Sequence, residues 1–259
     1  MQQSYRLPPA WKVIWITGAS TGIGRELALS LAASGAKVAV SARSAEKLTE
    51  LERASPNIKA YPLDVTNPEQ SAATASAIAR DLGPIDVAIL GAGLWIPMAG
   101  DDFDAPDVIQ SMTVNYIGAA NVLGPLIPAM IARKSGHIAV IASVAGYRGL
   151  PQATAYAPTK AALICLCETL YLDLKRHNVA VTVINPGFVD TPMTKVNDFP
   201  MPFLMGPQEA ADIIIKGLIG GGFEIVFPWR MKMLTKFTRI LPYSLFFALT
   251  KRITPKRKT

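Results

Sequence analysis

An alternation of short apolar runs with helix-like stretches constrains the fold of this chain more than any other feature. The runs are KVIWI (12–16), AKVAVSA (36–42), IKAYPL (58–63), DVAIL (86–90), HIAVIA (137–142) and VAVTVI (179–184). Between them, apolar positions recur at helical spacing over 22–34, 44–53, 67–82, about 105–132 and about 154–177. Strands that are apolar throughout indicate a parallel sheet covered on both faces. We therefore predict an α/β Rossmann fold, doubly wound, with its ligand crevice at one edge of the sheet.

Length and composition favour one globular domain over 1–259. The 259 residues suffice for one large core, and no repeat or long linker divides them. Cys165 and Cys167 diverge by about 200° on a helix, so no disulfide is expected between them. Two isolated histidines, His137 and His177, predict no metal site. The first residues contain no apolar segment of signal-peptide length, so we expect a cytoplasmic protein.

The net charge of +7 comes from the end of the chain. Residues 226–259 carry nine Lys or Arg and no acid, which leaves 17 basic and 19 acidic residues in the remainder. A slightly acidic body argues against a nucleic-acid partner. Residues 228–259 form a basic amphipathic extension, with an apolar face of Met231, Leu234, Phe237 and Leu241 and a basic face of Lys232, Lys236 and Arg239.

Two partners fit this extension. Its longest uncharged run, 240–250, has 11 residues, which is too short for the ~20 residues that span a bilayer. A basic amphipathic helix commonly lies on an anionic membrane surface, which predicts peripheral membrane contact. The alternative is a helix whose apolar face packs on a neighbouring subunit.

The segment ITGASTGIG (16–24) follows the first apolar run. Gly18, Gly22 and Gly24 lie where a strand turns into a helix, and glycines there let the backbone approach a pyrophosphate at the helix N-terminus. A plain turn is the alternative interpretation. After the second run, Ala42 stands where an acid would favour NAD, and Arg43 follows it.

An arginine at that position can pair with a 2′-phosphate through its planar fork, and the Ser20 hydroxyl can add a hydrogen bond to the same phosphate. A solvated surface arginine is the alternative. The pattern favours NADP(H) as the cofactor.

Tyr156 and Lys160 in YAPTK are four residues apart, so they lie on one helix face. A neighbouring ammonium favours the phenolate form, which would make the tyrosine usable as an acid or base. The chain has a second such pair, Tyr171 and Lys175, which lies roughly 22 Å farther along the same helix and away from the crevice. We interpret Tyr171 as a packing residue.

Two further polar residues lie near the predicted crevice. Ser143 ends the run HIAVIAS and can donate to a substrate oxygen, although serine at a strand end is commonly a turn former. Asn115 lowers helix propensity within a long helix and can hold a water molecule.

The segments TGASTGIG, LDV, VNYIG, IASVAG, YAPTK and INPGFVDTP together resemble the short-chain dehydrogenase/reductase family, over about residues 12–226. The resemblance implies a sheet order of 3-2-1-4-5-6-7 and a homodimer or homotetramer formed through two long helices. It also implies catalytic roles for four residues. Tyr156 would be the acid/base, Ser143 would orient the substrate, Lys160 would bind the nicotinamide ribose and lower the Tyr156 pKa, and Asn115 would anchor a proton-relay water.

The motifs and the resemblance together give a set of cofactor-binding residues. The set comprises Gly18, Ser20, Thr21, Gly22, Ile23, Gly24, Arg43, Asp64, Val65, Ala92, Gly93, Tyr156, Lys160, Pro186, Gly187, Val189 and Thr191. The chain departs from the family's Asn-Asn-Ala-Gly after the fourth strand, where it has Leu90-Gly91-Ala92-Gly93. Because the second amide usually braces the central sheet, we expect a local rearrangement or some loss of stability here, which Gly91→Asn would restore.

The family builds its substrate lid after the sixth strand, here within residues 186–219. Apolar residues there and in the LWIPM loop predict a pocket for a hydrophobic ketone. The predicted pocket residues are Leu94, Trp95, Ser143, Tyr147, Tyr156, Phe188 and Met193.

We therefore expect an oxidoreductase that reduces a hydrophobic, possibly lipid-derived ketone with NADPH. The alternative is a non-catalytic NADP-binding module that senses redox state or docks a membrane or partner. The presence of all four catalytic residues disfavours that alternative, because a sensor needs only the cofactor contacts.

Overall fold

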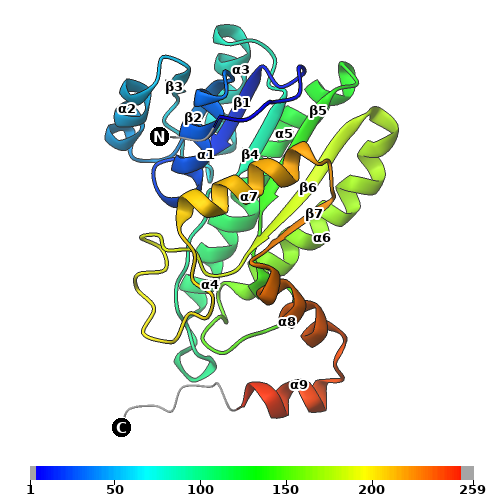
Figure 1. The fold of residues 1–259 in the computed structure, drawn as a ribbon. Coiled ribbons are helices and arrows are strands. Elements are labelled where there is room, and N and C mark those ends of the chain that lie inside the picture. Colours follow the sequence, from blue (N-terminus) through cyan, green and yellow to red (C-terminus); the bar gives the residue numbers. More distant parts are fainter. Residues whose placement is uncertain (1–3, 252–259) are drawn as a thin grey trace.

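A seven-stranded parallel sheet organises the protein, in a computed structural model that describes residues 4–251 (Figure 1). Its strand order is β3-β2-β1-β4-β5-β6-β7, which confirms the expected topology. The strands are β1 Val13–Thr17, β2 Lys37–Ser41, β3 Ile58–Ala60, β4 Val87–Leu90, β5 Gly136–Ile141, β6 Val179–Pro186 and β7 Glu224–Phe227. The order reverses between β1 and β4, so the carboxyl ends of these two strands flank the ligand crevice typical of such sheets.

Helices cover both faces of the sheet (Figure 1). Within residues 4–251 they are α1 Gly22–Ala33, α2 Ala45–Ala54, α3 Pro68–Asp81, α4 Ala105–Met112, α5 Gly118–Ala132, α6 Ala157–Leu174, α7 Pro207–Ile219, α8 Trp229–Ile240 and α9 Tyr243–Thr250. Helices α1 and α7 pack on one face, and α3, α5 and α6 pack on the other. Successive side chains of β1 point to opposite faces of the sheet. Ile14 and Ile16 belong to the hydrophobic core under α1 and α7, and Val13 and Trp15 belong to the core on the other face.

Local sequence signals explain where several helices begin. The Asn67 side chain accepts a hydrogen bond from the Gln70 amide at 2.7 Å, and Pro68 occupies the first turn of α3. Asp104 caps α4 in the same way through the Asp107 amide. These caps set boundaries within a residue or two of those expected from periodicity.

The helical stretch over 105–132 is interrupted by one π-helical turn, Thr113–Ile117, between α4 and α5. By length and composition alone the stretch could cross a membrane. Here, however, Val122, Leu126 and Met130 are buried against the sheet, as expected for the core helix of a globular domain. The π turn carries Asn115, and such turns often mark functional sites.

Three regions differ from the sequence-based expectations. The periodicity missed β7, because four residues with only two fully buried give a weak strand signal. The expected lid over 186–219 is too long, since α7 within it packs Ala210, Ile214 and Leu218 into the core. Only the irregular segment 187–206 remains available as a lid.

The extension after β7 is two helices rather than one amphipathic helix. Its chain breaks at Leu241 and Pro242, between α8 and α9, so Leu241 does not continue the α8 face. Met231 is buried, while Leu234 and Phe237 are exposed. The basic residues Lys236 and Arg239 instead lie close to the body, in ion pairs with Glu224 and Glu168.

Candidate active site

The glycine-rich turn after β1 is required by the packing of the chain itself. Gly18 has φ +72°, and a Cβ on it would lie 2.5 Å from the Gly91 carbonyl oxygen. A Cβ on Gly24 would lie 2.4 Å from the Gly18 carbonyl oxygen, and one on Gly22 2.8 Å from Thr191 Cγ2. Side chains are excluded at all three positions, so the backbone itself forms the surface at the start of α1.

The N-terminus of α1 suits a pyrophosphate. Thr21 is the N-cap residue and its side chain makes no capping hydrogen bond, so the first amides of the helix remain available. Ser20, Thr21 and Ile23 are partly buried around this end. The helix end is therefore suited to the phosphates of a dinucleotide, and the residues predicted to bind them stay a prediction.

Arg43 and Asp64 lie at neighbouring strand ends. Hydrogen bonds from the Thr66 amide and hydroxyl, at 2.9 and 2.8 Å, together with the charge of Arg43, hold the Asp64 pKa below its ordinary value. Arg43 is exposed and follows β2, so its guanidinium is available to an anion. Val65 is buried, and its carbonyl accepts from Asn121 Nδ2 at 2.9 Å, which fixes this wall to α5.

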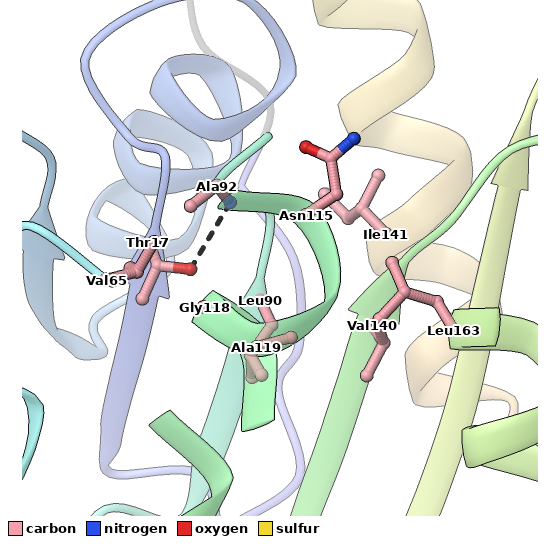
Figure 2. A pocket seen from close by; sticks show the side chains of 10 residues that line it. All are labelled: Thr17, Val65, Leu90, Ala92, Asn115, Gly118, Ala119, Val140, Ile141 and Leu163. Atoms are coloured by element: carbon pink, nitrogen blue, oxygen red, sulfur yellow. Dashed lines mark hydrogen bonds between the residues drawn. The ribbon is translucent and has the colours of Figure 1, made fainter. Parts of the chain in front are cut away.

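Thr17 braces the loop Leu90-Gly91-Ala92-Gly93, which lacks the two asparagine side chains of the family pattern. Its hydroxyl accepts from the Gly91 amide at 3.2 Å. It also accepts from the Ala92 amide at 3.3 Å (Figure 2). Beside it is a cavity of about 10 Å³, room for a single water centre, whose lining includes Thr17, Ala92 and Asn115 (Figure 2). A Cβ at Gly91 would lie 3.0 Å from the Thr17 carbonyl oxygen and from Ile141 Cδ1, so Asn at this position has no ready space.

The Thr17 hydroxyl therefore supports this loop in place of an asparagine side chain, and we no longer expect the loop to be weakened. Gly91→Asn is not expected to stabilise the protein. Sequence reasoning missed Thr17. Its signal was a hydroxyl at the last position of β1, directly before the glycine turn.

Asn115 connects three parts of the site. Its Oδ1 accepts from the Leu94 amide at 2.6 Å, and its Nδ2 donates to the Leu94 carbonyl and to Thr159 Oγ1, both at 3.0 Å. Thr159 Oγ1 donates in turn to the Tyr156 carbonyl at 2.7 Å. Asn115 thus holds the loop after β4 against the start of α6, and both protons of its amide are used within the chain. Its expected role in anchoring a water remains a prediction.

Lys160 lies within the same cluster. A Cβ on Gly93 would be 3.4 Å from Asn115 Oδ1 and 3.7 Å from Lys160 Nζ, which places all three residues together. Lys160 is only 4% exposed, and its Nζ donates to the Ile141 carbonyl at 3.0 Å. Burial lowers the pKa of Lys160 to about 8.

Tyr156 and Ser143 complete the cluster at the carboxyl end of β5. Burial raises the pKa of Tyr156 to about 12, and a hydrogen bond with Ser143 opposes this shift. Lys160 Nζ lies 5.4 Å from the Tyr156 ring centroid and bonds to Ile141 rather than to the phenol. Burial is the largest influence on the Tyr156 pKa in this structure, and the expected lowering of that pKa by Lys160 stays a prediction. Tyr156 is a protonated phenol near neutral pH.

The aromatic wall beside Tyr156 comes from the loop after β4. Trp95 packs edge-on against Tyr156, with ring centroids 4.9 Å apart, and its Nε1 donates to Asn197 Oδ1 of the lid segment at 2.9 Å. Phe188 packs on Phe199 within the lid segment, with centroids 6.1 Å apart. Met193 lies on the exposed side of that segment. Asn197 was missed by sequence reasoning, since a single lid asparagine has no distinguishing pattern.

The remaining predicted residues follow β6. Pro186 ends the strand, and the Gly187 amide donates to the Phe227 carbonyl at 2.7 Å. Val189 is buried, and its carbonyl accepts from Thr194 Oγ1 at 2.7 Å. Thr191 touches the glycine turn at Gly22, so this segment borders the cofactor region.

Tyr147 contacts both β7 and the C-terminal helix α8. Its ring is buried, and its hydroxyl bonds to Glu224 of β7 and accepts from Asn185 Nδ2 at 2.9 Å. Lys236 and Arg239 of α8 lie over the same ring, at 5.4 and 5.5 Å from its centroid. Tyr147 therefore anchors the C-terminal helices, and its expected place in the substrate pocket stays a prediction. Across residues 4–251, no cluster of three or more His, Cys, Asp or Glu side chains could hold a metal ion.

Comparisons with known proteins show which proteins this chain is similar to. An uncharacterized oxidoreductase of Myxococcus xanthus is 35% identical over 94% of this chain and 98% of its own length. The bovine dehydrogenase/reductase SDR family member 7B is 32% identical over 95% of this chain and 83% of its own.

Among solved structures, a short chain dehydrogenase from Burkholderia cenocepacia in complex with NADP has a TM-score of 0.81 and 28% identity, covering 98% of this chain and all of its own. A family model described as short chain dehydrogenase matches residues 12–199. The protein is thus an oxidoreductase that belongs to the short-chain dehydrogenase/reductase family.

Proposed function

We propose that this protein is an NADPH-dependent reductase that converts a hydrophobic ketone to a secondary alcohol. The observation that carries the proposal is the cluster of Tyr156, Ser143, Lys160 and Asn115 at the carboxyl end of β5. Each polar atom in it has a partner that fixes its position, as general acid catalysis requires. When bound, NADPH supplies the hydride that reaches the carbonyl carbon.

Tyr156 supplies the proton in this reaction. Its pKa of about 12 keeps the phenol protonated near neutral pH, so its Oη–H can donate to the oxygen that becomes negative. Ser143, already hydrogen bonded to Tyr156, is placed to donate to the same oxygen. Lys160 retains substantial positive charge at neutral pH and stabilises the phenolate that remains.

The choice of NADPH rests on Arg43. Its exposed guanidinium follows β2, beside Asp64. A planar fork of donors at this point pairs well with a 2′-phosphate. The NADP complex of the Burkholderia protein supports the same choice.

The choice of a hydrophobic ketone rests on the residues around Tyr156. Trp95 forms one wall, and the paired rings of Phe188 and Phe199 lie in the lid segment. Apolar walls with few polar groups favour an apolar substrate. A lipid-derived ketone is the class that fits best.

The test is NADPH oxidation with ketones of graded chain length, measured for the parent, Tyr156→Phe and the matched control Tyr171→Phe. We expect the parent and Tyr171→Phe to turn over long-chain ketones, and Tyr156→Phe to lose at least about 100-fold in kcat while binding NADPH normally. NADPH binding by the parent with no oxidation across the series would favour the redox-sensing or docking module. A separate variant, Arg43→Ala, tests the choice of cofactor. We expect it to lose NADPH binding and to bind NADH as the parent does.

A further inference from the structure

The two C-terminal helices are fixed to the catalytic end of the molecule. Arg148, five residues after Ser143, donates to the Thr238 carbonyl at 3.2 Å and to the Leu241 carbonyl. Its guanidinium also lies 4.7 Å from the ring centroids of both Tyr243 and Phe246. Figure 1 shows α8 and α9 below the carboxyl ends of the strands, at the same end as the lid segment. The extension is therefore part of the surface around the active site.

These helices turn their apolar side outward. On α8 the residues Trp229, Met233, Phe237 and Ile240 follow one helical face and are 55–77% exposed. On α9 the exposed apolar residues are Tyr243, Leu245, Phe247 and Leu249. Only Met231 and Phe246 are buried among the large apolar residues of these helices. We call this exposed face, over residues 229–249, the apolar end face.

The apolar end face continues onto the lid. Arg230 of α8 lies 5.7 Å from the ring centroid of Phe203, which is itself exposed. Among the described residues, 15 of the 20 exposed large apolar side chains lie in four segments at this end: 93–104, 148–153, 188–205 and 228–250. Apolar surface gathered at one end of a molecule marks an interaction site rather than scattered exposure.

Charge identifies the kind of partner. The described residues 226–251 contain five Lys or Arg and no acid. Lys236 and Arg239 pair with Glu224 and Glu168 of the body, and the charges of Arg230, Lys232 and Lys251 remain for a partner. A second copy docked by this face about a twofold axis would bring like charges together, because each copy would present the same surface. An anionic lipid surface instead meets both the cations and the apolar side chains. Helices of 12 and 8 residues are too short to span a bilayer, which takes ~20 residues, so they would lie in its plane.

We infer that the apolar end face is a docking surface for anionic lipid bilayers. Trp229 and Tyr243 occupy positions suited to the headgroup level, as aromatic residues with a polar tip do in membrane proteins. Lys232 and Arg230 flank the apolar face and contact the phosphates. The lid segment then faces the bilayer.

The test is flotation of the full chain with vesicles of 70% phosphatidylcholine and 30% phosphatidylglycerol, compared with pure phosphatidylcholine. Phe237→Ser/Phe247→Ser and Lys232→Glu alter the surface, and Leu172→Ser on α6 and Lys47→Glu on α2 are matched exposed controls. We expect the parent and both controls to float with anionic vesicles. Lys232→Glu should bind about tenfold more weakly, with the loss reduced at high salt.

The double serine variant should lose binding at any salt concentration. Its Tm should fall only slightly, because both phenylalanines are exposed and Phe247 loses only its ring contacts with Tyr243 and Phe246. Parent protein that stays at the bottom of the gradient with both vesicles overturns the inference. So does a parent dimer, detected by light scattering without lipid, that the double variant converts to a monomer: the face would then be a contact between copies. The readout needs no ketone and no cofactor, so its failure leaves the proposed reductase activity unaffected.

Discussion

Helix α6 carries the same Tyr-x-x-x-Lys spacing at both ends, and the two pairs have opposite surroundings. At the first, Lys160 is 4% exposed and bonded to the Ile141 carbonyl, and Tyr156 packs on Trp95. At the second, Tyr171 is 37% exposed and packs on Phe223, with its ring centroid at the same 4.9 Å distance. Spacing alone therefore does not make a catalytic pair. The strand ends beside the first pair give it the surroundings that the proposed reaction requires.

The largest difference between the two pairs should appear in activity after the lysines are replaced. We expect Lys160→Met to lower kcat for ketone reduction at least about 100-fold, because the charge that stabilises the Tyr156 phenolate is lost. Lys175→Met should leave kcat within twofold, since Lys175 is exposed at the far end of the helix. Steady-state kinetics with saturating NADPH measures both. Equal loss in the two variants would remove the distinction between the pairs.

The pH dependence of stability sharpens the same comparison. The unfolded Lys160 pKa is near 10.5 and the folded value is about 8, so the unfolded state binds more protons between these values. Burial of the charged amine therefore destabilises the protein fully below pH 8, and this penalty shrinks as the pH rises toward 10.5.

We expect the free energy of unfolding of the parent, relative to Lys160→Met, to rise by about 2 kcal/mol from pH 7 to pH 9.5. Urea unfolding of both proteins at each pH measures the difference. A constant difference across that range would show that Lys160 titrates alike in the folded and unfolded states.

The parts of the molecule that were predictable follow from repeated local patterns. Buried strands such as β1 leave an unbroken apolar run, so six of the seven strands were predicted from periodicity. The strand order came from the family resemblance, and the structure confirms it. The turn at Gly18 was predictable for a similar reason, because glycine is needed where φ is positive.

The rest depends on contacts between residues far apart in the chain. The Thr17 brace, the Trp95 to Asn197 hydrogen bond and the turn of Tyr147 toward Glu224 each join segments at least 70 residues apart. A single sequence has no periodicity that records such pairs. The burial that raises the Tyr156 pKa was not predictable for the same reason, since burial is a property of the whole fold.

The smallest effects should distinguish the aromatic partners of the two tyrosines. Trp95→Phe removes the hydrogen bond to Asn197 and changes the ring against Tyr156, so we expect KM for the ketone to rise about three- to tenfold with kcat nearly unchanged. Phe223→Leu removes the ring against Tyr171 and should lower the free energy of unfolding by about 1 kcal/mol with KM unchanged. Kinetics and urea unfolding on both variants separate the outcomes. Phe223 packs on Tyr171, which lies 15 residues after Tyr156. A changed KM in Phe223→Leu would therefore mean that packing at the far end of α6 influences ketone binding.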